Sequence, residues 1–134
     1  MSEFKYRFWV DDKMILPDDP SNDFVILPNG SIQKWNKNKA YLEPAPGVVA
    51  MPYAGPTDQI GTEICEADIF SFGINMVGEV FYKKETASFL VRFSPPKNDA
   101  SLTFFLQMNG RPKIIGNSYQ NPELKKLIEK NDAR

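Results

Sequence analysis

The stretch Met51-Pro-Tyr-Ala-Gly-Pro-Thr-Asp-Gln-Ile-Gly-Thr-Glu-Ile-Cys-Glu-Ala-Asp-Ile69 indicates the fold of this chain more clearly than any other segment. It contains two turns, one short strand and an acidic approach to the next strand. No arrangement of side chains within it is typical of a catalytic site. The stretch therefore predicts an architecture of short strands and tight turns, and it leaves the function open.

Before this stretch, the sequence predicts short strands that pair locally. Residues 4–10 alternate so that aromatic side chains can share one face of a strand, and residues 14–16 follow as a short return strand. Residues 24–27 and 31–35 predict a hairpin around the turn Pro28-Asn-Gly30, because glycine tolerates a positive φ there. The N-terminal third of the chain is therefore expected to form hairpins.

After the stretch, strand patterns continue almost to the C-terminus. The segments expected to be strands are residues 67–72, 77–82, 88–93, 102–106 and 112–115. Two further predictions concern the connections: residues 83–86 and Asn109-Gly110 as hairpin turns, and residues 94–99 as a loop. An aromatic content of 13% agrees with this reading, because large flat side chains favour strands.

The C-terminal segment changes to a helical period. Asn121 is a suitable N-cap, Pro122 fits the first helical position, and a glutamate follows where the helix end is positive. Leu124, Leu127 and Ile128 then recur at spacings of three and four, which gives one apolar stripe. The sequence predicts a short amphipathic helix over about residues 122–130.

These elements predict a mainly β fold with one appended helix. At 134 residues the chain fits a single domain, and its 42% hydrophobic content is ordinary for a globular protein. Many short strands favour a small, strongly curved barrel or a sandwich. We expect an SH3-like barrel core over about residues 48–118, a layer of hairpins over about residues 1–47, and the helix at about residues 122–130.

Composition argues against several classes of function. The chain has no histidine and one cysteine, Cys65. Nucleophile pairs of the Ser-His and Cys-His kinds are therefore excluded, and a structural zinc site lacks its usual ligands. The lone thiol is expected to be a buried structural group. We expect no enzymatic activity and no cofactor.

Charge and hydropathy argue against membranes and bulk nucleic-acid binding. The net charge is -1, whereas a surface that attracts nucleic acid or anionic lipid over its whole extent would be more basic. No apolar run approaches the roughly 20 residues that span a bilayer. The first residues lack the apolar centre of a signal peptide. With one cysteine and no internal disulfide, the cytoplasm is the simplest compartment.

Three carboxylates, Glu63, Glu66 and Asp68, form the first candidate site. They could bind Mg²⁺ or Ca²⁺ through oxygen, or act as an acid and base pair. The alternative is a polar turn in which the carboxylates accept backbone N–H groups at the start of a strand. We favour the turn, because ligands that alternate across a strand do not converge on a metal.

Basic residues near aromatic side chains form the second candidate. Such a patch could hold a phosphate backbone while a ring stacks on a base. A solvated loop beside a core tryptophan, and hairpin tips that serve solubility, are the favoured alternatives, and Asp23 is one of several acidic residues that could neutralise the loop. The residues of the tentative nucleic-acid patch are Lys34, Trp35, Lys37, Lys39, Arg111 and Lys113.

Three sequence blocks resemble a known family. Lys5-Tyr-Arg-Phe-Trp9 resembles the family's opening strand, and Ile115-Gly-Asn-Ser-Tyr-Gln-Asn-Pro-Glu-Leu124 its C-terminal motif. The family's middle motif is matched by Met51, Tyr53, Gly55, Asp58, Gly61, Glu63, Ile64, Glu66, Asp68 and Ile69. The chain is similar to the YopX-like proteins of phages and prophages of Gram-positive bacteria. It departs from their middle motif at Pro52, Ala54 and Ala67, and an alanine cannot adopt a positive φ cheaply where the family has glycine.

The resemblance implies an intracellular phage or prophage protein that self-associates, and it supplies no catalytic residues. We rank three hypotheses. The first is a non-enzymatic module that forms a homo-oligomer and binds a host or phage protein. The second is a nucleic-acid-binding barrel that uses the basic patch. The third, a metal-dependent enzyme built on the carboxylates, ranks last.

Overall fold

The structure is a computed structural model that describes residues 5–72, 76–94 and 98–130. Within these residues, antiparallel strands form three sheets. The four-stranded sheet has the order β2-β1-β6-β7, the five-stranded sheet β11-β10-β9-β8-β12, and the three-stranded sheet β3-β4-β5. The fold is mainly β, as the sequence predicts.

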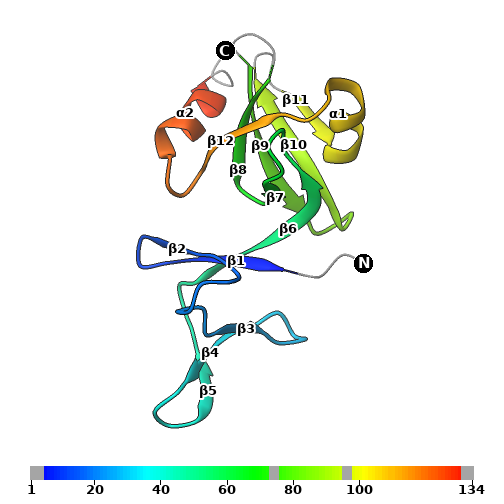
Figure 1. The fold of residues 1–134 in the computed structure, drawn as a ribbon. Coiled ribbons are helices and arrows are strands. Elements are labelled where there is room, and N and C mark those ends of the chain that lie inside the picture. The colour runs from blue at the N-terminus through cyan, green and yellow to red at the C-terminus, as the bar shows by residue number, and fades with distance from the viewer. Residues whose placement is uncertain (1–4, 73–75, 95–97, 131–134) are drawn as a thin grey trace.

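The three sheets follow one another along the molecule (Figure 1). The three-stranded sheet forms the lower end, the four-stranded sheet crosses the middle, and the five-stranded sheet curls in the upper part with a helix on either side. The middle sheet contains β1 (Tyr6–Val10), β2 (Lys13–Ile15), β6 (Val49–Thr57) and β7 (Glu63–Cys65). Strand β6 links the middle sheet to the upper part.

The lower sheet contains β3 (Phe24–Ile26), β4 (Ile32–Asn36) and β5 (Tyr41–Pro44). The hairpin predicted over residues 24–35 is confirmed, since β3 and β4 pair around the turn at Gly30, whose φ is 87°. The ring of Phe24 lies 5.2 Å from that of Phe8 on β1. This contact joins one face of the lower sheet to the middle sheet.

The upper sheet contains β8 (Asp68–Phe72), β9 (Met76–Lys83), β10 (Ser88–Ser94), β11 (Asn98–Ser101) and β12 (Lys113–Asn117). The predicted hairpin of residues 77–93 is confirmed by the pairing of β9 with β10. Of the predicted loop at residues 94–99, residues 95–97 lie outside the described part of the chain. Ser94, Asn98 and Asp99 belong to strands, so the prediction is wrong for them.

One predicted strand is a helix. Residues 102–106 belong to α1 (Leu102–Asn109), which begins where the Ser101 side chain accepts the N–H of Phe104. Leu102 and Phe105, three residues apart, are both buried against the upper sheet. By itself, the apolar run of residues 102–106 is compatible with a strand or with a helix. The segment is a helix because the three-residue spacing lets both buried side chains pack against the upper sheet. The predicted hairpin turn at Asn109-Gly110 is likewise wrong, because Gly110 ends the helix and β12 pairs with β8.

The C-terminal helix is confirmed as α2 (Pro122–Lys130), with Ile128 buried. Asn121 directly precedes the first helical residue, as predicted for an N-cap, but its side chain bonds to β12. The Asn121 side-chain oxygen accepts the N–H of Asn117, 3.1 Å away on β12. A Cβ at Gly116 would lie 2.3 Å from that oxygen, so a larger residue there would force the Asn121 side chain to move.

Ala67 adopts the positive φ that its family counterpart, a glycine, would take easily. Its φ is 76°, its N–H donates to Val80 over 2.7 Å, and its carbonyl accepts from Ser118 over 3.0 Å. These bonds hold the turn between β7 and β8 against the strain of the left-handed conformation. The alanine therefore retains the turn geometry.

We expect Ala67→Val to lower the free energy of unfolding by about 2–4 kcal/mol, because a branched side chain is strained at positive φ and overfills a site that is 5% exposed. Ala67→Gly should stay within about 1 kcal/mol of the wild type. The relief of backbone strain stabilises this variant, whereas the lost burial of the methyl group and the greater entropy of the unfolded chain destabilise it. These effects nearly cancel. Urea unfolding measures both variants, and equal losses for the two would contradict the strain argument.

Candidate functional site

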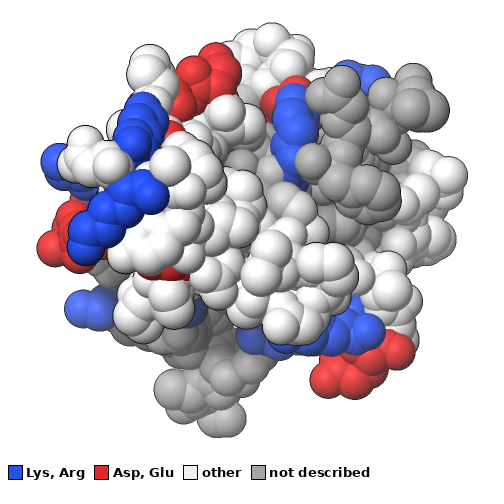
Figure 2. All heavy atoms as spheres, turned by 90° about the horizontal axis from the view of Figure 1, so that it is seen from below, with Lys and Arg blue, Asp and Glu red and all other residues white. Residues whose placement is uncertain are grey.

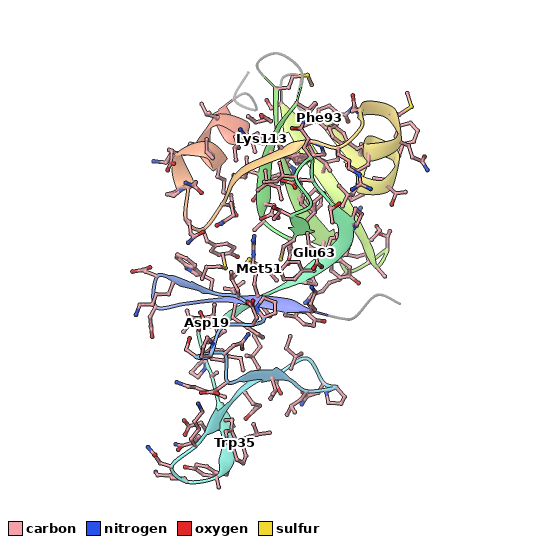
Figure 3. All side chains as sticks on the ribbon, in the orientation of Figure 1. Asp19, Trp35, Met51, Glu63, Phe93 and Lys113 are labelled. Carbon is pink, nitrogen blue, oxygen red and sulfur yellow. The ribbon has the colours of Figure 1, made fainter. Side chains whose placement is uncertain are left out.

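Residues of the stretch 51–69 line a cleft at the junction of the middle and upper sheets. The cleft has a volume of about 570 Å³. Its charged and polar lining residues include Lys5, Arg7, Asp18, Tyr53, Glu63 and Asp68. Figure 3 shows Glu63 at this junction, far from Trp35 at the lower end. Because these lining residues extend from Lys5 to Asp68, the cleft is formed by residues that are distant in sequence.

A buried ion pair forms the floor of this cleft. Arg7 Nη2 lies 2.7 Å from Asp68 Oδ1 and 3.0 Å from the carbonyl oxygen of Glu66. The Arg7 and Asp68 side chains are 9% and 3% exposed. Asp68 also accepts the N–H of Cys65 over 2.8 Å. Burial raises the pKa of Asp68, and the Arg7 charge and the Cys65 N–H partly offset that rise.

A second, more exposed pair lies beside it and involves Lys5, which directly precedes β1. Lys5 Nζ forms an ion pair with Glu63, and their side chains are 33% and 38% exposed. The Lys5 ammonium also lies 5.5 Å from the centre of the Tyr53 ring. Burial raises the pKa of Tyr53 to about 12, and the neighbouring Cys65 adds to the rise. Tyr53 therefore presents a neutral phenol at ordinary pH.

The three candidate carboxylates have separate partners. Glu63 pairs with Lys5, Asp68 pairs with Arg7, and Glu66 accepts the N–H of Tyr82 over 3.0 Å. Burial raises the pKa of Glu66. Asp68 and Glu66 thus accept backbone N–H groups, as the turn interpretation predicts. Across the residues that the structure describes, no group of three or more His, Cys, Asp or Glu side chains is arranged to hold a metal ion.

Asp58 braces the loop that forms one rim of the cleft. Its side chain accepts the N–H groups of Ile60, Thr62 and Ile114 at 3.1, 2.8 and 3.3 Å. Burial on its own raises the pKa of Asp58, but these backbone bonds outweigh burial and leave the pKa below its usual value. The loop presents Ile60 to solvent, with the side chain 80% exposed.

Cys65 is a buried structural thiol. Its Sγ lies 3.4 and 3.3 Å from the carbonyl oxygens of Met51 and Pro52, and the residue is fully buried. Burial raises the pKa of the thiol to about 12. Such a thiol is almost entirely protonated near neutral pH and is a poor nucleophile.

The structure divides the six residues of the tentative nucleic-acid patch. Lys34, Trp35, Lys37 and Lys39 belong to the lower sheet and its β4–β5 turn, whereas Arg111 and Lys113 lie in the upper part. Figure 3 shows Trp35 and Lys113 at opposite ends of the molecule. Arg111 donates to the Thr57 hydroxyl. The six residues therefore do not form one surface.

The four patch residues that belong to the lower sheet and its β4–β5 turn do not project in one direction either. Register places Lys34 on the face opposite to Trp35, and the Lys34 ammonium lies 5.9 Å from the Phe24 ring. Lys37 lies 3.6 Å from Asp23, and the Lys39 ammonium 6.0 Å from the Tyr41 ring. Seen from below in Figure 2, Lys and Arg side chains are interspersed with acidic and uncharged residues.

The comparisons with known proteins agree with this architecture. The family model described as YopX protein matches residues 5–126. The chain belongs to the YopX family. The match covers both strands and loops of the cleft, and it confirms the resemblance found in the sequence.

Two solved structures share the fold of this YopX family member. Protein YopX from Bacillus subtilis has 22% identity and a TM-score of 0.55, over 90% of this chain and 96% of that protein. Protein EF1440 from Enterococcus faecalis has 22% identity and a TM-score of 0.51, over 92% of this chain and 99% of that protein. No curated protein matches the chain. Neither helix in the described residues is long and apolar enough to cross a membrane.

The sequence did not reveal the pairing partners of the cleft. Lys5 and Arg7 alternate with Tyr6 and Phe8, which is also the pattern of a strand with one solvated face. Arg7 is 8% exposed, because the start of β8 lies against that face of β1. The available signal was indirect: Arg7 belongs to the first family block and Asp68 to the second.

Proposed function

We propose that this YopX family member is a non-enzymatic cytoplasmic module of phage or prophage origin that self-associates and binds a host or phage protein. The observation that supports self-association is an uncharged face of the lower sheet. Val25, Trp35 and Leu42 lie on this face and are 39%, 41% and 41% exposed. Side chains of this size left in solvent mark interaction surfaces when they are contiguous.

Strand register makes these side chains contiguous. Trp35 on β4 pairs with Leu42 on β5, and Gln33 pairs with Val25 on β3 and with Pro44 on β5. Residues directly opposite in an antiparallel pair project to the same side of the sheet. We call this set, Val25, Gln33, Trp35, Leu42 and Pro44, the uncharged face.

A second copy of the chain fits this face. None of its five residues carries a charge, and Asp23, which lies opposite Trp35 in the same register, pairs with Lys37, so two copies can pack face to face about a two-fold axis without burying unpaired charges. The opposite face carries Lys34 and Glu43 and contacts the middle sheet through Phe24. Pairing through the uncharged face therefore leaves the contact between the lower and middle sheets intact.

The test is the effect of Leu42→Glu on solution mass. We expect the wild type to associate at tens of micromolar and Leu42→Glu to weaken association at least tenfold, because two copies would each bury an unpaired carboxylate. Leu16→Glu is the matched control: Leu16 is 45% exposed but lies outside the uncharged face. Sedimentation equilibrium measures all three. A strictly monomeric wild type, or equal effects of both variants, would reject this interface.

Nucleic-acid binding is the alternative function, and the aromatic and basic residues at the β4–β5 turn favour it. Trp35 is exposed there, and the turn carries Lys37 and Lys39. Fluorescence titration with single-stranded DNA and RNA at low and moderate salt separates the two proposals. Binding that weakens with salt and with Lys37→Ala/Lys39→Ala supports the alternative. Absent binding, or binding that salt does not affect, removes it.

A further inference from the structure

The turn between β6 and β7 presents one apolar side chain to solvent in a fixed position. Ile60 lies at its tip and, at 80% exposure, is the most exposed large hydrophobic side chain in the part of the chain that the structure describes. The Asp58 carboxylate accepts the N–H groups of Ile60 and Thr62, and the Asp58 N–H donates to the Thr62 carbonyl over 2.8 Å. We call residues 58–62 the Ile60 turn. Because these bonds fix its shape in the free chain, docking of Ile60 loses little conformational entropy.

A groove with apolar walls lies between α1 and the upper sheet and has a volume of about 570 Å³. Phe104 and Met108 are four residues apart on α1, so they share one side of the helix, and Met108 is 68% exposed. Figure 3 shows Phe93 in the upper part of the molecule, and its ring lies 5.9 Å from that of Phe105 on α1. The lining residues of this α1 groove are Phe72, Met76, Phe93, Ala100, Phe104, Phe105, Met108 and Asn109.

The Ile60 turn and the α1 groove match in charge and in size. The exposed end of the turn consists of Gln59, Ile60, Gly61 and Thr62, and none of the eight groove residues is charged either. Docking one on the other therefore buries no unpaired charge. The groove volume lies within the roughly 300–1,000 Å³ of pockets that enclose small ligands, which leaves room for the tip of a tight turn.

We infer that Ile60 of one copy docks into the α1 groove of a second copy of this chain, against Phe104 and Met108. The turn does not line the groove of its own copy, so the contact joins two molecules. Two different surfaces meet in it, and each copy keeps a free turn or a free groove for the next, so copies add head to tail. This contact uses no residue of the uncharged face and does not depend on the face-to-face pairing proposed above.

The strength of this contact follows from its size. One turn in one groove is a small interface, and small interfaces are weak and transient. We expect a dissociation constant of roughly 0.1–1 mM, which sets the protein concentration for the measurement at up to about 1 mM.

Complementary variants test the contact in a Leu42→Glu background, which removes association through the uncharged face. Ile60→Glu places a charge on the turn, and Met108→Glu places one in the groove. Both positions are exposed in the free chain, so folding does not bury either charge. By sedimentation equilibrium, each variant should associate at least tenfold more weakly than the Leu42→Glu parent. A 1:1 mixture of the two should recover association to within about threefold of the parent, because one copy has an intact turn and the other an intact groove.

Methyl signals in nuclear magnetic resonance locate the contact. The Ile60 methyl signal of carbon-13-labelled Met108→Glu protein should shift and saturate when unlabelled Ile60→Glu protein is added. Unlabelled Met108→Glu protein, which lacks an intact groove, should leave that signal unchanged at the same concentration.

Leu16→Glu in the same background is the matched control, since Leu16 is exposed but lies outside the Ile60 turn and the α1 groove. It should leave association unchanged. A Leu42→Glu parent that stays monomeric at about 1 mM would overturn the proposal. So would a mixture that stays as dissociated as its two components, or a loss with Leu16→Glu as large as that with Ile60→Glu.

Discussion

Arg7→Ala is expected to lower the free energy of unfolding by about 3–5 kcal/mol, because removal of one partner leaves a buried charge without compensation. Asp68 is 2% exposed, and its other hydrogen bond comes from the N–H of Cys65. The variant also leaves the carbonyl of Glu66 without its bond from Arg7. Denaturant unfolding near neutral pH measures the loss.

Lys5→Ala is the matched control for Arg7→Ala. Lys5 lies on the same face of the chain two residues away and also pairs with a carboxylate, but its partner Glu63 is 38% exposed. Pairs exposed to solvent contribute about 0–1 kcal/mol. If Lys5→Ala destabilised the protein as much as Arg7→Ala, burial would not be the reason for the large effect.

The loss in Arg7→Ala should depend on pH. Burial holds the pKa of Asp68 above 3.8, so the wild-type carboxyl binds its proton more tightly in the folded than in the unfolded chain. The contribution of Asp68 to stability therefore declines as pH rises from 3.8 through its folded pKa. Without Arg7 the pKa rises further, and the difference between variant and wild type should shrink in acid, where Asp68 is neutral. A difference independent of pH would contradict this origin.

The double variant Arg7→Met/Asp68→Leu separates the ion pair from packing. Replacing a whole buried pair with apolar groups of similar volume is often neutral or stabilising, because the charges no longer need to leave water. We expect the double variant to be more stable than Arg7→Ala by at least about 2 kcal/mol. If it were as unstable as Arg7→Ala, specific contacts of the guanidinium would matter more than charge compensation.

Local pattern was sufficient to predict the β3–β4 and β9–β10 hairpins and the C-terminal helix. The β9–β10 hairpin has alternating apolar residues and a polar turn between its strands, and both signals agree with the final pairing. Residues 122–130 carry an apolar stripe and a proline at the first helical position, so their helical state needs little help from the rest of the chain.

Helix α1 could not be predicted with the same evidence. Thr103, Phe104 and Phe105 favour a strand by intrinsic preference, yet the segment is helical because Leu102 and Phe105 both reach the core from one helical face. That choice depends on β8 to β10, which form the surface below the helix. A prediction made from residues 102–106 alone cannot take that surface into account.

The candidate site shows the same limit. The stretch of residues 51–69 contributes to the lining of the cleft, but its carboxylates were considered as a cluster, whereas each has its own partner elsewhere in the chain. Lys5 and Arg7 lie about sixty positions earlier in the chain. Long-range pairing of this kind requires the register of β1 with β6, which the sequence does not encode locally.

Phe105→Ala is expected to lower the free energy of unfolding by about 3–5 kcal/mol, because it empties the centre of an aromatic cluster. The Phe105 ring lies 4.6 Å from that of Phe72, 5.4 Å from Phe70 and 5.9 Å from Phe93. Phe105 is 3% exposed, so the lost contacts join α1 to two strands of the upper sheet, β8 and β10. Alanine favours a helix more than phenylalanine does, so weaker helix formation cannot explain the loss.

Phe104→Ala is the control for this prediction. It makes the same chemical change one position earlier on the same helix, at a side chain that is 57% exposed. We expect Phe104→Ala to change the free energy of unfolding by about 1 kcal/mol or less. Thermal and urea unfolding of the two variants should therefore differ strongly. Similar losses would mean that α1 does not dock through Phe105, and that the strand predicted for residues 102–106 has to be reconsidered.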